Sequence, residues 1–188
     1  MPAVARQTHL RSRRQDRSGW FERLNWTGVT DLQQAQYLVR SLICFSKRAI
    51  DRAYIYFYDD DDKASVHASS GLTRHFQPKT SFWAVRHLYQ TLGDYRFRRV
   101  VQEVEGDVYV YEFAHGRDPT KVTWVVWSPT GSGREKEVTL QGLPCSPWRI
   151  ERMPIDQAPA LEVASSPAGD GQIRLKVTES PVYVRMQK

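Results

Sequence analysis

The hydrophobic and polar positions of this chain change their period near residue 94. Between residues 30 and 94, apolar side chains recur every three or four positions in two segments, which is the spacing of an amphipathic helix. From residue 95 onward they alternate with polar side chains over short runs, which is typical of half-buried strands. The pattern therefore predicts three parts: an irregular basic tail over 1–29, a helical part over 30–94, and a β-rich part over 95–188.

The first predicted helix begins near Thr30 and continues to about Ile50. Thr30 and Gln33 have the spacing of a capping box, in which each side chain bonds the other residue's backbone N–H. The apolar stripe that follows consists of Leu32, Ala35, Leu38, Val39, Leu42 and Ile43. Such a stripe must be covered by another part of the structure.

The second predicted helix begins after Pro78 and ends at Gly93. Thr80 or Ser81 is the expected cap, because a side-chain oxygen at this position can accept a bond from the first free backbone N–H groups. Its apolar stripe consists of Phe82, Val85, Leu88 and Leu92.

Between the two helices lies AYIYFYDDDDK, residues 53–63. Its six near-continuous apolar and aromatic residues predict a strand that is buried on both faces, as in a parallel sheet. Four consecutive aspartates follow at residues 59–62, and we expect most of them to lie in a solvated loop, because like charges repel one another. A calcium loop is excluded, since Lys63 and Ala64 replace a required oxygen ligand and the required glycine.

Seven short strands are predicted after residue 94, separated by turn signals such as Glu105-Gly106-Asp107. They are FRRVVQEV, DVYVYEFA, KVTWVVWS, EKEVTLQG, PWRIERM, QIRLKVTE and PVYVRM. Seven strands in roughly ninety residues indicate an antiparallel β-sandwich. In the second strand, Val108 and Val110 share one face, and Tyr109 and Tyr111 share the other.

The chain has 188 residues, a formal charge of +6 and a pI near 9.4. Its basic excess is concentrated in the tail, where the arginines are Arg6, Arg11, Arg13, Arg14 and Arg17. No glycine-rich phosphate loop or zinc-finger spacing accompanies them, so we expect no nucleic-acid partner. No apolar run approaches the ~18 residues of a membrane span, so we expect no membrane partner. Cys44 and Cys145 give neither a disulfide framework nor a metal signature, and we expect no metal and no cofactor.

The order of these elements resembles the last part of a clan A glycoside hydrolase barrel of the xylosidase-like kind, followed by its small C-terminal β-sandwich. The resemblance is carried by SGW, VTDLQQAQYLVRSL, AYIYFYDDDD and SGLTRHFQPKTSFWAVRHLYQTLGDYRF, and downstream by the strands to ESPVYV. It implies an α+β fold in which a helix-strand-helix remnant of a (β/α) barrel precedes an antiparallel sandwich. It also implies that the related enzymes hydrolyse O-glycosidic bonds with retention.

The resemblance further implies that both catalytic carboxylates are absent from this chain. The related enzymes carry their nucleophile in a Thr-Glu-x-Gly-Trp pattern, and Arg17 stands at the position of that glutamate, before Gly19 and Trp20. An arginine stays protonated and cannot attack an anomeric carbon. The acid/base glutamate of an Asn-Glu motif would lie before residue 1. Since retaining hydrolysis requires both groups, we expect the chain to be inactive by itself, with no catalytic residue to assign.

Tyr58 and Asp59 are the predicted substrate-binding residues, because barrel loops at the carboxyl ends of strands line the substrate cleft. Packing and capping are the alternative roles for this pair. His67 and His75 have no third ligand at metal spacing. The tryptophans are candidate sugar platforms or core residues, and Trp124 and Trp127 must point to opposite faces of their strand. The four are Trp83, Trp124, Trp127 and Trp148.

Two functions therefore stay open. In the first, the chain is the C-terminal fragment of a glycoside hydrolase, and the aromatic residues over 54–57 must be covered by the sandwich, by a second copy of the chain or by missing barrel sequence. In the second, it is a non-catalytic module in which the sandwich binds a carbohydrate or a protein. The sequence assigns neither a sugar specificity nor a cellular compartment.

Overall fold

A computed structural model gives the structure of the chain and describes residues 29–60, 69–129 and 133–188. The arginine-rich tail with Arg17, the last two aspartates of the acidic run and His67 lie outside the described residues. Within the described ranges, no helix is long and apolar enough to cross a membrane.

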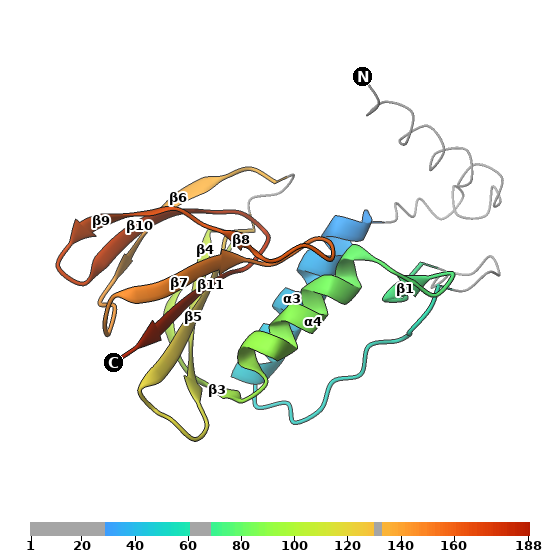
Figure 1. The fold of residues 1–188 in the computed structure, drawn as a ribbon, viewed down its shortest axis with the longest axis horizontal. Helices are drawn as coiled ribbons and strands as arrows, with labels where there is room; N and C mark the ends of the chain where they lie inside the picture. The colour runs from blue at the N-terminus through green and yellow to red at the C-terminus, as the bar shows by residue number, and fades with distance from the viewer. Residues whose placement is uncertain (1–28, 61–68, 130–132) are drawn as a thin grey trace.

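Two helices pack side by side on one face of the β-rich part (Figure 1). Helix α3 spans Asp31–Lys47 and ends three residues before the predicted end. The predicted capping box is confirmed: the backbone N–H of Gln33 donates to Thr30 Oγ1 over 3.1 Å, and that of Thr30 donates to Gln33 Oε1 over 2.9 Å.

Helix α4 spans Thr80–Leu92 and ends at Gly93, as predicted. Its start differs from the prediction, because Lys79 is the N-cap residue and no side chain caps the helix. The prediction that Thr80 or Ser81 caps α4 is therefore wrong. Lys79 takes this position because its ammonium group is held by the Asp60 carboxylate, with Nζ 3.1 Å from Oδ1.

Two antiparallel sheets form the sandwich, and all seven predicted strands are present. The larger sheet contains, in spatial order, β3 (Tyr95–Val104), β4 (Val108–His115), β5 (Lys121–Trp127), β11 (Val182–Gln187), β7 (Pro147–Arg152) and β8 (Leu161–Glu162). The smaller sheet contains β6 (Lys136–Gln141), β10 (Gln172–Val177) and β9 (Ser165–Gly169). Strands β8 and β9 escaped prediction because one has two residues and the other is the sequence SSPAG, which lacks the β-branched and aromatic residues of most strands.

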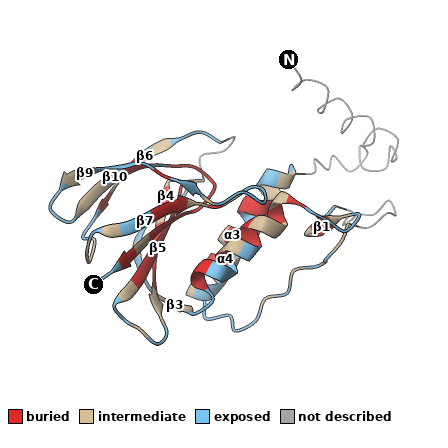
Figure 2. Cartoon of the chain, in the orientation of Figure 1, coloured by how far each residue is buried: buried red, intermediate tan, exposed pale blue. Residues whose placement is uncertain are grey.

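Both faces of the six-stranded sheet are covered. Between the two sheets, an apolar cluster contains Val110 and Trp124, and on the opposite face a second cluster joins α3 and α4 to Tyr111 and Trp127. Figure 2 shows the buried residues along these strands and along the adjoining sides of the helices. The predicted faces of β4 and the opposite placement of Trp124 and Trp127 are confirmed. The α+β fold with a β-sandwich is thus present, while the division of the chain at residue 94 stays a prediction.

The segment over 53–58 departs from its prediction. It is extended but belongs to no strand, and its exposure alternates along the chain. Ile55 packs against the helices, whereas Tyr54, Tyr56 and Tyr58 are 86%, 73% and 59% exposed. The predicted strand buried on both faces is therefore wrong. The physical reason is that no described strand pairs with this segment to build a sheet, and the helices contact only the side that carries Ile55.

Candidate functional site

The segment over 53–58 ends in a backbone bridge to the short hairpin of β1 (Thr73–Arg74) and β2 (Gln77–Pro78). The N–H of Thr73 donates to the carbonyl of Tyr58 over 2.9 Å, and the N–H of Asp60 donates to the carbonyl of Thr73 over 2.9 Å. These two bonds fix the backbone of the two predicted substrate-binding residues. The side chain of Tyr58 remains exposed.

Asp59 is oriented by the same hairpin. Its Oδ1 accepts a hydrogen bond from Thr73 Oγ1 over 2.6 Å and another from the backbone N–H of Phe76 over 3.0 Å. The Thr73 hydroxyl, followed by the bond from Phe76, lowers the pKa of Asp59 below its ordinary value despite the opposing effect of desolvation. The structure therefore gives Asp59 a local binding partner, and its contact with a substrate stays a prediction.

Asp60 lies in an ion network rather than in the solvated loop expected for most of the acidic run. Its side chain is 8% exposed, and it contacts Lys79 Nζ over 3.1 Å and Arg74 Nε over 2.9 Å. Arg74 also donates two bonds to the Asp31 carboxylate, of 3.0 and 3.1 Å, at the start of α3. The network thereby ties the end of the extended segment to the N-terminal ends of both helices.

Gly71 is required beside this network. A Cβ atom at residue 71 would lie 2.5 Å from the carbonyl carbon of Asp59 and 2.6 Å from the nitrogen of Asp60, both of which are backbone atoms. The carbonyl of Gly71 also accepts a 2.9 Å hydrogen bond from Lys79 Nζ. Close approach of two backbone segments, rather than a positive φ, explains the glycine.

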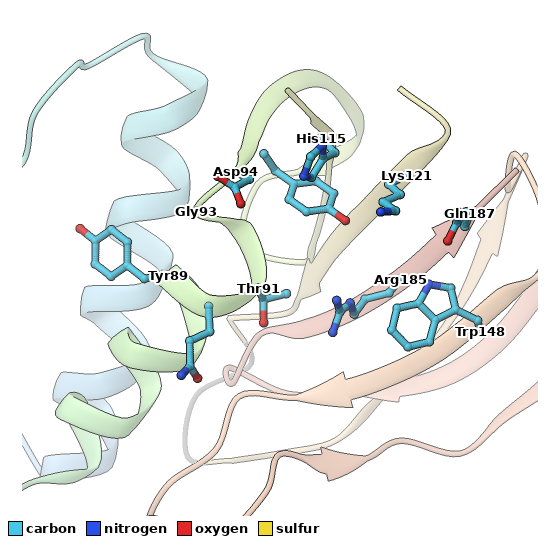
Figure 3. Close-up of a pocket in the computed structure, with 11 residues that line it drawn as sticks. Tyr89, Thr91, Gly93, Asp94, His115, Lys121, Trp148, Arg185 and Gln187 are labelled. Atoms are coloured by element: carbon cyan, nitrogen blue, oxygen red, sulfur yellow. The ribbon is translucent and has the colours of Figure 1, made fainter. Parts of the chain in front are cut away.

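A second candidate site lies at the other end of α4. A hollow of about 610 Å³ opens where α4 ends against the larger sheet. Figure 3 shows Arg185 beside Trp148, with Lys121 and Gln187 on neighbouring strands and Asp94 just after the helix. With thirteen residues, α4 separates this hollow from the Asp60 network by about 20 Å.

A buried carboxylate contacts Arg185, one of the residues that line the hollow. Glu151 has a side chain 2% exposed, and it contacts Arg149 Nε over 2.5 Å and Arg185 Nη1 over 3.4 Å. His87 Nε2 on α4 lies 3.6 Å from the same carboxylate. Burial lowers the pKa of His87 more than the Glu151 carboxylate raises it, so the imidazole is neutral at pH 7.

Trp148 is the exposed tryptophan of this region, at 57%. The guanidinium of Arg185 lies over its ring at 4.5 Å from the centroid, a cation–π arrangement that orients both groups. By contrast, Trp124 and Trp127 are 0% and 3% exposed and belong to the core. Trp83, on α4, is half-buried and contacts Arg86 in the same manner at 5.5 Å.

Sequence reasoning missed Arg149, Glu151 and Arg185. The signal that could have found them is the placement of charges within predicted strands. Arg149 and Glu151 alternate in β7 and Arg185 interrupts β11, so each lies on a strand face that should be buried. In the described part of the chain, no three His, Cys, Asp or Glu side chains are grouped to hold a metal ion. His75 is exposed on the β1–β2 turn.

No protein-family model matches the chain, and no curated protein matches it in sequence. Among solved structures, the chain is similar to a family 39 glycoside hydrolase from the gut symbiont Bacteroides cellulosilyticus WH2, with a TM-score of 0.66 and 19% identity. The match covers 85% of this chain and 31% of the hydrolase chain. The predicted resemblance to a clan A, xylosidase-like glycoside hydrolase is confirmed at the level of the fold, and the chain spans about a third of that relative's length.

Proposed function

We propose that this chain is the closing part of a glycoside hydrolase scaffold whose parent activity is retaining hydrolysis of O-glycosidic bonds. In this function it supplies the last barrel segment, its flanking helices and the sandwich, and it has no hydrolytic activity by itself. The observation that carries the proposal is the match of 85% of this chain to 31% of a family 39 glycoside hydrolase.

The exposed tyrosines of the segment over 53–58 support the same function. In a barrel, side chains alternate between the interior and the surrounding helices. Ile55 contacts the helix cluster, while Tyr54, Tyr56 and Tyr58 lie on the opposite, exposed side. We propose that the remaining barrel strands cover this side, and that self-association covers it when they are missing.

Tyr58 and Asp59 then lie at the carboxyl end of the last barrel segment, on the side that lines the cleft in such enzymes. The Tyr58 ring would stack on a sugar, and Asp59 would accept hydrogen bonds from its hydroxyl groups. Asp60 does not join them as a catalytic acid, because Lys79 and Arg74 already hold its carboxylate. Two carboxyl groups about 5 Å apart across an open cleft are what retaining hydrolysis needs.

The test combines an activity assay with a surface assay on the full chain. We expect no hydrolysis of aryl glycosides above the buffer rate, and we expect binding of a hydrophobic dye. Replacing Tyr54, Tyr56 and Tyr58 together by serine should reduce the dye signal without changing the far-ultraviolet circular dichroism. Replacing Tyr89, which is 58% exposed on α4, is the matched control and should leave the dye signal unchanged.

Turnover of any aryl glycoside would contradict the proposed inactivity. A monodisperse monomer that binds no dye would contradict the proposed missing cover, because the tyrosine side would then need none.

We propose carbohydrate binding by the sandwich as a second function, independent of hydrolysis. The observation that favours it is the hollow beside Trp148, where an exposed indole and several polar side chains face a common space (Figure 3). Fluorescence titration of the chain with oligosaccharides tests it, and a saturable shift without turnover is the expected result.

A further inference from the structure

We infer that the hollow at the C-terminal end of α4 binds an acidic saccharide, a sugar ring that carries a carboxylate. The inference rests on the second function proposed above and names its ligand class. It does not depend on the hydrolase proposal, because the hollow and the Tyr58–Asp59 backbone lie at opposite ends of α4.

The aromatic part of the site is Trp148. Its indole is 57% exposed, whereas the other two strand tryptophans, Trp124 and Trp127, are buried. Arg185 holds the ring from one side at 4.5 Å, so the ring has a set orientation before a ligand arrives. A pyranose ring presents a face of C–H groups that packs on such an indole, whereas a small inorganic anion has none.

The cationic part of the site follows from an unequal charge count. Among the side chains that line the hollow, Arg185 and Lys121 are cationic and Asp94 is anionic, so the lining has one positive charge in excess. Arg185 shares the buried Glu151 carboxylate with Arg149, and these two partners lie outside the lining. Arg185 Nε is also buried without a hydrogen-bond partner in the described structure. Lys121 adds an ammonium group to the lining, 42% exposed and 3.4 Å from Asp118. Arginine and lysine donors are the groups that recognise a carboxylate.

The remaining lining suits hydroxyl groups. Nδ1 of His115 accepts bonds from the backbone N–H groups of Arg117 and Asp118, over 3.2 and 3.1 Å, so Nε2 is the ring nitrogen left to donate a hydrogen bond. Gln187 offers both a donor and an acceptor, and Asp94 offers acceptors. The volume of about 610 Å³ lies within the range of roughly 300 to 1,000 Å³ found for small-molecule sites. Together these groups match a hydroxylated ring with one charged substituent.

The experiment is calorimetric titration of the full chain at low salt with three probes: a trisaccharide of galacturonic acid, xylotriose as its neutral counterpart, and inorganic phosphate. We expect the acidic trisaccharide to bind at least about tenfold more tightly than xylotriose, and phosphate to give no saturable signal. Replacing Trp148 by alanine should weaken binding of the acidic trisaccharide about tenfold or more.

Two matched controls locate the effect. Trp83→Ala removes another tryptophan that lies against an arginine, and it should leave the affinity unchanged. Lys121→Gln should reduce the preference for the acidic trisaccharide several-fold, whereas Lys176→Gln, at a 64% exposed lysine on the smaller sheet, should not. Because Trp148 and Lys121 are both substantially exposed, these variants keep the fold, which an unfolding curve checks.

Equal affinity for the neutral and acidic trisaccharides would overturn the inferred ligand class while leaving carbohydrate binding in place. Saturable binding of phosphate as tight as that of the acidic trisaccharide would overturn it in favour of a simple anion site. Absence of binding by both trisaccharides would overturn both the inference and the second function. An equal loss of affinity in Trp83→Ala would place the binding elsewhere and would overturn the site.

Discussion

The six-stranded sheet and the extended segment over 53–58 are both rich in aromatic residues, yet only the sheet is covered on both faces. Trp124 lies under the smaller sheet and Tyr111 under the helices, with 0% and 1% of their surfaces exposed. In the extended segment, Tyr54 and Tyr56 are 86% and 73% exposed, because the helices cover only the side that carries Ile55. The difference shows which surfaces the described residues cover and which one they leave exposed.

The size of this difference can be expressed as a free energy. Burying one large apolar side chain contributes about 1.5 to 3 kcal/mol. A partner that covered the three exposed tyrosines would therefore contribute several kcal/mol, which is comparable to the net stability of a whole domain. We expect substitutions to separate the two regions accordingly.

The largest expected effect is that of Trp124→Ala. This side chain is 0% exposed, and its Nε1 donates a 2.9 Å hydrogen bond to Glu112 Oε2, so its removal leaves a cavity and takes one of the two hydrogen bonds from that carboxylate oxygen, the other coming from Arg99. We expect a loss of about 4 kcal/mol in the free energy of unfolding, measured by urea denaturation. A loss below about 1 kcal/mol would mean that the covered region is packed no better than the uncovered one.

Lys79→Met should have the next largest effect, at the boundary between the two regions. The Lys79 side chain is 3% exposed, and the substitution would leave the buried Asp60 carboxylate with Arg74 as its one cation and the backbone N–H of Gly71 as its other donor among the described residues. We expect a loss of about 3 kcal/mol by urea denaturation, because an incompletely paired buried charge remains. Lys176→Met at an exposed ion pair is the control and should change the stability by less than about 1 kcal/mol.

Glu112 should make the covered region sensitive to acid. Burial alone would raise its pKa, but hydrogen bonds from Arg99 and Trp124 outweigh burial and lower the pKa below its ordinary value. A carboxyl whose pKa is lower in the folded state stabilises the fold above its unfolded pKa of about 4.3, and this stabilisation is lost as the pH falls through the folded value. Glu112→Gln should therefore flatten the fall of the unfolding free energy between about pH 5 and pH 3. An unchanged acid profile would show that Glu112 does not contribute to it.

Tyr54→Ser should have the smallest effect. Because this side chain is 86% exposed, its removal from the isolated chain loses almost no buried surface. We expect a change within about 0.5 kcal/mol in the free energy of unfolding. A loss of 2 kcal/mol or more would contradict the exposure of this side, since it would show that other residues of the chain cover it.

The sequence predicted well those features that depend only on residues close together in the chain. Thr30 and Gln33 gave the capping box, and alternation placed Tyr111 and Trp124 on opposite faces of one sheet. It failed at Tyr54 and Tyr56, because an aromatic run indicates a strand but does not say whether a neighbouring strand is present to pair with it. Cross-strand partners are far apart in the sequence, and local patterns carry no information about them.

In the candidate sites, too, single residues could be predicted but their long-range partners could not. Trp148 could be singled out from the sequence, as an aromatic residue in a predicted strand, but Arg185 comes to lie over it only through the pairing of β7 with β11. Similarly, Asp60 looked like one solvated acid among four, and only the fold brings Lys79 and Arg74 to it. Charges that are paired over long sequence separations therefore account for most of what sequence reasoning missed.

The central claim is that the described residues of this chain leave the side chains of Tyr54, Tyr56 and Tyr58 exposed on one side of the extended segment. Hydroxyl-radical footprinting of the full chain at low concentration, read by mass spectrometry, tests it most directly. We expect these three tyrosines to be modified about as fast as Tyr89, which is 58% exposed, and much faster than the buried Tyr111 and Tyr183. Protection of all three to the level of Tyr111 and Tyr183 would contradict the claim.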